Sequence, residues 1–193
     1  FDHKPTFLVT GATSGVGEAI ATQLSERRAR VLIGARTTER GQAAADRIRS
    51  RVPDADLQVV AGDLSLMREV RSLAYQIMDG TPRLDGLILN AAEAHSELML
   101  TDEDIETNFA TNHLAGFLLT HLLLPRLRSS APARVVAISS SVHTQVRMVD
   151  LTSVVTGAPL TPDSYRTSKL LNILFVRELA RRLEGIGITA NAA

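Results

Sequence analysis

The chain has 193 residues, of which 45% are apolar and 22% are charged, and this composition is typical of one soluble globular domain with a sizeable core. Its 21 basic and 21 acidic residues balance without a long run of one sign, which argues against nucleic acid or an acidic surface as a partner. Cysteine is absent and no apolar stretch approaches the ~20 residues of a membrane helix, so we expect no disulfide, no thiolate chemistry, no membrane segment and a cytoplasmic location.

Short apolar runs alternate with longer helical patterns, which is typical of βαβ units in a parallel sheet. The predicted strands are residues 6–10, 31–34, 57–61, 87–90, 135–139 and 188–191. The predicted helices are residues 16–27, 38–51, 66–78, 104–128 and 164–184, with Pro125 ending or bending the fourth. Residues 142–163 show no clear period and are predicted to form an irregular, functional loop. We therefore predict one α/β domain over residues 1–193, a Rossmann-type doubly wound parallel sheet of strand order 3-2-1-4-5-6.

A glycine-rich turn joins the first strand to the first helix, with Gly11, Gly15 and Gly17 in the spacing G-x-x-x-G-x-G. Glycines let the backbone approach a pyrophosphate, whose charge meets the helix N-terminus. The spacing is neither the generic G-x-G-x-x-G fingerprint nor a P-loop. We predict that a dinucleotide is bound by Gly11, Thr13, Ser14, Gly15, Val16 and Gly17, the alternative being a turn without a ligand.

The residues after the second strand bear on the choice of cofactor. An acidic residue there holds the ribose 2′-hydroxyl of NAD(H), whereas a basic one accommodates the 2′-phosphate of NADP(H). Here Ala35, Arg36 and Thr37 follow the strand, and arginine pairs well with phosphate. We expect NADP(H), with NAD(H) as the alternative if Arg36 only faces solvent.

Polar and small residues end the third and fourth strands, where ligands of open α/β sheets bind. Asp63 and Leu64 follow the third strand, and Asn90 and Ala91 end the fourth. We include all four in the predicted cofactor site. Asp63 could equally cap the helix that begins near Leu66.

Tyr165 and Lys169 stand four residues apart at the start of a predicted helix, so their side chains share a face. The chain has only two tyrosines and two lysines, which makes an accidental pair rare. Hydride delivery to a ketone leaves an alkoxide that needs a proton. A tyrosine hydroxyl, with a pKa of about 10, can supply it near neutrality if a cation about 4 Å away stabilises the phenolate by roughly 4 kcal/mol. An ordinary helical contact is the alternative.

Two further polar residues fit the same chemistry. Ser140 follows the fifth strand and can donate a hydrogen bond to a substrate oxygen, although serine is also common at strand ends. Asn112 lies inside the predicted helix 104–128, where asparagine is an indifferent helix former. Its amide can hold a water or a local backbone distortion, or it can lie on the surface.

These segments together resemble a known family. Residues 10–17, Asn90-Ala91-Ala92, Asn112-His113, Ser140 and Tyr165-x-x-x-Lys169 resemble, in order, the motifs of short-chain dehydrogenases/reductases, from about Thr6 to the chain's end. Residues 112–120, 139–143 and 169–175 resemble the retinol-dehydrogenase-like branch. Ala92 stands where the family usually has glycine, and the chain stops before the substrate loop and last strand that relatives carry, so we expect that C-terminal part to be missing.

The resemblance implies a role for each residue. Tyr165 is the general acid/base, Ser140 orients the substrate, Lys169 lowers the tyrosine pKa and binds ribose, and Asn112 holds a proton-relay water. Asp63 lies near the adenine and Asn90 beside the cofactor. The resemblance also implies a homodimer, which the apolar residues spread around 108–128 and 164–184 favour too; the alternative is that they pack under the loop 142–163.

We therefore expect an NADP(H)-dependent oxidoreductase that acts on a small apolar carbonyl or alcohol. The alternative is a non-catalytic dinucleotide sensor or scaffold, which would need only the glycine turn and not the four residues of catalytic type. A nucleoside-triphosphate enzyme would need a phosphate-binding lysine and metal carboxylates that the chain lacks at suitable places. The five histidines show no metal-ligand spacing, so we expect no metal.

Overall fold

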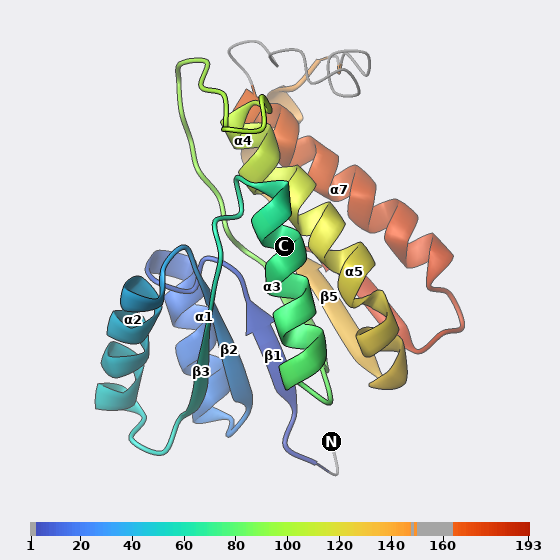
Figure 1. Ribbon diagram of the computed structural model, residues 1–193. Coiled ribbons are helices and arrows are strands. Elements are labelled where there is room, and N and C mark those ends of the chain that lie inside the picture. The colour runs from blue at the N-terminus through green and yellow to red at the C-terminus, as the bar shows by residue number, and fades with distance from the viewer. Residues whose placement is uncertain (1–2, 148, 150–163) are drawn as a thin grey trace.

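The computed structural model describes residues 3–147, 149 and 164–193. Within them, six parallel strands form one sheet of order β3-β2-β1-β4-β5-β6, which confirms the predicted Rossmann-type fold (Figure 1). The strands are β1 (Thr6–Val9), β2 (Arg30–Ala35), β3 (Asp56–Ala61), β4 (Gly86–Leu89), β5 (Ala133–Ala137) and β6 (Ile188–Ala192). Each predicted strand is present, and its ends agree to within two residues.

Helices cover both faces of the sheet (Figure 1). They are α1 (Gly15–Glu26), α2 (Thr38–Arg51), α3 (Met67–Gly80), α4 (Thr107–Phe109), α5 (Ala115–Ser129) and α7 (Ser164–Arg182). A π-helix, η1 (Ala110–Leu114), joins α4 to α5, and a 3₁₀ helix, η2 (Ser141–Gln145), follows β5. No described helix is long and apolar enough to cross a membrane.

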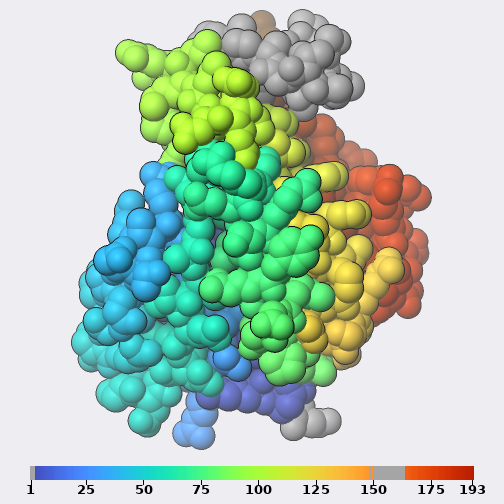
Figure 2. Space-filling model, viewed as in Figure 1, coloured from blue at the N-terminus to red at the C-terminus, as the bar shows by residue number. Residues whose placement is uncertain are grey.

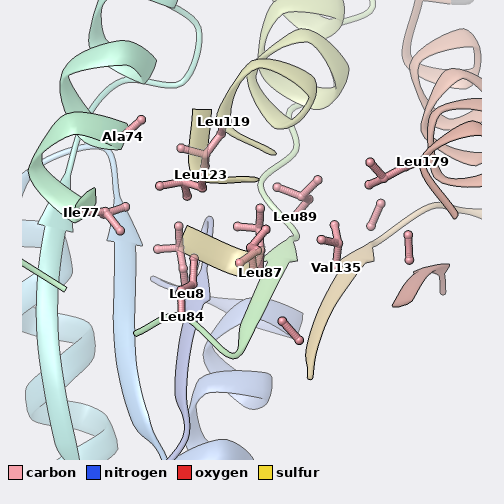
Figure 3. Close-up of a cluster of buried hydrophobic side chains, with 14 of the residues drawn as sticks. Leu8, Ala74, Ile77, Leu84, Leu87, Leu89, Leu119, Leu123, Val135 and Leu179 are labelled. Atoms are coloured by element: carbon pink, nitrogen blue, oxygen red, sulfur yellow. The ribbon is translucent and has the colours of Figure 1, made fainter. Parts of the chain in front are cut away.

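The apolar core is divided between the two faces of the sheet. On one face, leucines of β1, β4, α3 and α5 pack together with α7; Leu8, Leu87 and Leu123 are among those drawn in Figure 3. On the other face, α1 and α2 cover Val9, Val31 and Ile33 of the neighbouring strands. Nearly continuous burial of β1, β2 and β4 is expected for parallel strands covered on both sides. This rigid sheet fixes the turns at its carboxyl edge.

The prediction of one regular helix over residues 104–128 is wrong for the first third of that range. Residues 104–106 are not helical, and the helix that follows contains the π-turn of η1 before it becomes regular. The reason is tertiary: Asn112 in η1 makes side-chain hydrogen bonds to the backbone of Glu93, and its own carbonyl accepts from Asn172. Pro125 does not end α5, which runs on to Ser129. Of the predicted irregular loop 142–163, residues 142–145 lie in η2, whereas residues 148 and 150–163 lie outside the described residues.

Candidate active site

The glycine turn is tied to the end of β4. Gly11 has a φ of +62°, and a Cβ there would lie 2.8 Å from the Cα of Ala91, so both conformation and space require glycine. Asn90 Nδ2 donates to the carbonyl oxygens of Thr10 and Gly11 at 3.0 and 3.1 Å. The backbone N–H groups of Asn90 and Ala91 donate to Thr10 Oγ1 at 2.9 and 3.1 Å. Asn90 therefore stabilises the conformation of the glycine turn.

A cleft of about 290 Å³ opens above this turn, at the carboxyl ends of β1 to β4. Of the predicted cofactor residues, it is lined by Gly11, Thr13, Ser14, Val16, Gly17, Arg36, Leu64, Asn90 and Ala91. Gly15 (φ +53°) belongs to the same turn, and Asp63 reaches the cleft through its contact with Arg36. Within the described chain, Ser14 makes no side-chain capping bond to α1, so the first N–H groups of this helix stay free for a ligand. The glycine cradle and these donors fit the pyrophosphate of a dinucleotide.

Other residues of the cleft were not among those predicted. They are Thr10, Gly34, Ala35, Arg40, Gly62, Leu73, Ala92, Glu93 and Thr111. Arg40 lies one turn along from Arg36 at the start of α2, a spacing that could have indicated a second cation for a phosphate. Glu93 had no signal in the sequence, because its approach to the cleft depends on the path of the chain after β4.

Arg36 contacts carboxylates from the segments that follow β3 and β4. Its Nε lies 3.5 Å from Asp63 Oδ2, and its Nη2 is in direct contact with Glu93 Oε1. The alternative that Asp63 caps α3 is wrong: Asp63 Oδ1 accepts from Ser65 N, whereas the first N–H groups of α3 donate to Glu103.

Of the predicted catalytic residues, Tyr165 and Lys169 lie at the start of α7, and Ser140 lies between β5 and η2. Lys169 is buried at 3% exposure, its Nζ donates to Ile138 O at 3.1 Å, and this Nζ lies 5.5 Å from the ring centroid of Tyr165. Burial lowers the pKa of the Lys169 ammonium. Ser139 Oγ donates to Lys169 O at 2.9 Å, which ties the two segments together. Ser140 comes next, as the residue that caps η2, with its Oγ accepting from Val142 N at 3.4 Å.

A ladder of buried polar side chains joins α4 and η1 to α7. Asn112 Oδ1 accepts from Glu93 N at 2.7 Å, and its Nδ2 donates to Glu93 O and Ser168 Oγ at 2.8 and 3.2 Å. One turn earlier, Asn108 makes the same pattern with the backbone of His95 and with Ser164 Oγ. The side-chain amide of Asn112 is therefore used by the protein itself.

The ladder continues past Asn112 along α7. Asn172 donates to Asn112 O at 2.9 Å, and its Oδ1 lies 2.9 Å from His113 Nδ1. Burial lowers the pKa of His113, against the raising effect of this hydrogen bond. Asn108 was not predicted from the sequence, although its spacing of four from Asn112 repeats the spacing of Ser164 and Ser168. The ladder fixes the helix that carries Tyr165 and Lys169.

Replacing Thr111 by valine is expected to stabilise the protein, whereas the same change at a hydrogen-bonded buried threonine is expected to destabilise it. Its Oγ1 is buried and finds no hydrogen-bond partner among the described residues, whereas Oγ1 of Thr120, which is also a buried threonine, donates to Gly116 O at 2.7 Å. We expect Thr111→Val to raise the free energy of unfolding by up to about 1 kcal/mol and Thr120→Val to lower it by about 1 kcal/mol, measured by urea denaturation. A loss of stability in Thr111→Val would instead indicate a water bound in the adjoining cavity of about 10 Å³.

In the part of the chain that the structure describes, no three His, Asp or Glu side chains gather as metal ligands would.

Comparison with known proteins adds a family and relatives. The family model described as short chain dehydrogenase matches residues 5–193. Dehydrogenase/reductase SDR family member 13 of Bos taurus is 44% identical over 191 residues, which are 97% of this chain and 50% of that protein. Retinol dehydrogenase 14 of Mus musculus is 41% identical over 201 residues, which are 98% of this chain and 60% of that protein. The chain thus spans about half to three fifths of these curated relatives.

Solved structures share the fold. The Pseudomonas aeruginosa RhlG/NADP active-site complex matches with a TM-score of 0.79 and 32% identity, covering 97% of this chain and 70% of that one. A protein from Mycobacterium Paratuberculosis matches with a TM-score of 0.82 and 38% identity, covering 97% of this chain and 66% of that one.

Proposed function

The chain belongs to the short chain dehydrogenase family, in the retinol-dehydrogenase-like branch as its sequence predicted, and from this we propose that it is an NADP(H)-dependent oxidoreductase acting on an apolar carbonyl or alcohol. One observation carries the proposal: the buried Lys169 lies 5.5 Å from the Tyr165 ring and is bound to the end of β5, at the same edge of the sheet as the dinucleotide cleft. Relatives named retinol dehydrogenases support an apolar substrate, and a neighbour solved with NADP supports the cofactor.

In this mechanism, bound NADP(H) supplies or accepts the hydride at the substrate carbon. Tyr165 Oη donates a proton to the carbonyl oxygen as the alcohol forms, and accepts it in the opposite direction. The Lys169 ammonium stabilises the resulting phenolate and binds the ribose. Ser140 Oγ donates a hydrogen bond that orients the substrate oxygen. Because its side-chain amide is engaged, Asn112 would hold a proton-relay water through its backbone carbonyl, which also accepts from Asn172.

The cleft would bind the cofactor in three places. Gly11, Gly17 and the free N–H groups of α1 would face the pyrophosphate. Asp63 and Leu64 would lie at the adenine, and Arg36 would contact the 2′-phosphate.

The test is oxidation of NADPH by the full-length protein with a panel of apolar ketones and aldehydes. Turnover with at least one member, absent in Tyr165→Phe, is the expected result. Tight NADPH binding without turnover of any substrate in either direction would favour the non-catalytic sensor instead.

Cofactor choice is tested by Arg36→Ala. We expect the variant to bind NADPH more weakly by about 1.5–3 kcal/mol, because charged hydrogen bonds to the phosphate are lost, and to bind NADH almost unchanged. Fluorescence titration of both cofactors measures this, with NADH as the internal control. An equal loss of affinity for NADPH and NADH would mean that Arg36 does not bind the 2′-phosphate, and NAD(H) would then be as good a candidate for the cofactor.

We also propose a homodimer through α5 and α7. Phe117 and Leu174 on these helices are 48% and 44% exposed, and Phe117 lies 5.4 Å from the Phe175 ring. Light scattering at micromolar concentration should give twice the chain mass, and Phe117→Glu with Leu174→Glu should give the monomer. A monomeric mass for the unaltered protein would contradict this proposal.

A further inference from the structure

An ion pair crosses the cleft in which the dinucleotide would bind. Arg36 follows β2, and Glu93 lies in the segment after β4, which is drawn in light green in Figure 1. The strands β2 and β4 flank β1, so their ends stand roughly 10 Å apart. Both side chains line the cleft, and their contact spans it above the glycine turn.

The backbone of Glu93 is held in a position from which its side chain reaches Arg36 across the cleft. Its backbone N–H and carbonyl are both bound by the side-chain amide of Asn112, at 2.7 and 2.8 Å. Its carboxylate is therefore not carried on a free loop, and its side chain is only 22% exposed. Atoms of the segment 91–106 are seen in yellow-green toward the top of Figure 2, and the segment is fixed at Glu93 by Asn112 and again at His95 by Asn108.

The charges around Arg36 nearly cancel. Asp63 Oδ2 lies 3.5 Å from Arg36 Nε, and Glu93 occupies Nη2, so the guanidinium faces carboxylates on both sides. Arg40 adds one positive charge to the wall of the cleft. A phosphate that binds a guanidinium in a fork needs two of its N–H donors. Glu93 already contacts Nη2 and Asp63 lies beside Nε, so a phosphate arriving at Arg36 would compete with these carboxylates.

From this arrangement we infer that Glu93 is a specificity-determining residue: its carboxylate competes with the 2′-phosphate of NADP(H) for Arg36 and so lowers the preference for NADP(H) over NAD(H). The inference rests on the proposed reading of the phosphate by Arg36. NAD(H) has no 2′-phosphate and does not need Arg36 released, so the competition acts on one cofactor only. The enzyme would therefore prefer NADP(H) over NAD(H) less strongly than the two arginines, Arg36 and Arg40, would predict without Glu93.

The test is Glu93→Gln, which keeps the size of the side chain and removes its charge. We expect the Kd for NADPH to fall about threefold to tenfold at low salt, while the Kd for NADH changes less than about twofold. The gain should shrink as salt screens the partly exposed pair. The fold should be unaffected, because the hydrogen bonds of Glu93 to Asn112 use backbone atoms and a glutamine oxygen can keep the 3.3 Å contact with His95 Nε2; thermal unfolding checks this.

Two companion variants make the result specific. Glu97→Gln removes the same charge from an exposed position in the same segment and should change neither Kd. In an Arg36→Ala background, Glu93→Gln should lose its effect on NADPH, because the competition needs the guanidinium.

The outcomes separate this inference from the proposed function. If Arg36→Ala weakens NADPH selectively but Glu93→Gln leaves NADPH unchanged, tightens both cofactors equally or weakens either, the inference is overturned and the proposed cofactor choice stands. A gain from Glu93→Gln that persists without Arg36 also overturns it. If Arg36→Ala weakens both cofactors equally, the proposed reading of the phosphate fails, and the inference fails with it.

Discussion

Tyr165→Phe is expected to lose turnover by about 10²- to 10⁴-fold while its Kd for NADPH changes by less than about twofold. The change removes one oxygen, the atom that would donate a proton to the substrate, and leaves the ring that lies 5.5 Å from Lys169 Nζ. The ladder from Asn108 to Asn172 that fixes α7 involves no Tyr165 side-chain atom, so the helix should keep its place. The loss should therefore appear in kcat and not in cofactor affinity.

The chain offers a matched control for this variant. Tyr75, the other tyrosine, is 68% exposed on α3, away from the cleft, and Tyr75→Phe should keep full turnover. Steady-state kinetics and fluorescence titration, run on both variants at the same pH, give the comparison. Substantial turnover in Tyr165→Phe would refute the proposed acid–base role, and an equal loss in Tyr75→Phe would point to a general effect of the substitution.

The fold followed closely from the sequence because its signals are local. Each strand is a short run of buried apolar residues, and α2 occupies the predicted residues 38–51 without any difference. The strand order then follows from right-handed crossovers and from the position of the glycine turn after β1. What local patterns could not give was the break in the helix at residues 104–114. Apolar periodicity continues through it, and only the contacts of Asn108 and Asn112 with residues far along the chain identify the π-turn.

Residues that line the cleft could be predicted where they follow strand ends, since parallel strands bring those ends to one edge of the sheet. Asn90 is the instructive case: its position was predicted, but its bonds to the carbonyl oxygens of Thr10 and Gly11 show that it also shapes the turn. Glu93 could not be found in this way. Its approach to Arg36 needs the path of the chain after β4, which depends on the amide of Asn112.

Lys169→Met is expected to lower turnover and, at the same time, to raise the free energy of unfolding. An ammonium about 5 Å from a phenolate oxygen, at an effective dielectric of about 20, stabilises the phenolate by roughly 3 kcal/mol. Lys169 Nζ lies 5.5 Å from the centre of the Tyr165 ring, so we expect its loss to lower turnover near neutral pH roughly a hundredfold. The pH profile for alcohol oxidation should move to higher pH, because the phenolate then forms only in more alkaline solution. Lys4→Met is the matched control: Lys4 is the other lysine, half-exposed and paired with Asp56, and its loss should leave the profile unchanged.

The same variant should unfold less readily than the unaltered protein. Burial lowers the pKa of Lys169, so the folded state carries an ammonium that water would solvate better. Below the lowered folded pKa the group is charged in both states and the cost of burial is complete; between that pKa and the ordinary unfolded one, the unfolded chain binds more protons and stability rises with pH. Methionine has nearly the same length and no charge, so we expect a gain of about 1–3 kcal/mol in urea denaturation at pH 7 that shrinks in alkaline solution. A variant that lost both activity and stability would show that Lys169 supports the fold through its hydrogen bond to Ile138 O. That result would contradict the view that the buried lysine serves catalysis and costs the protein stability.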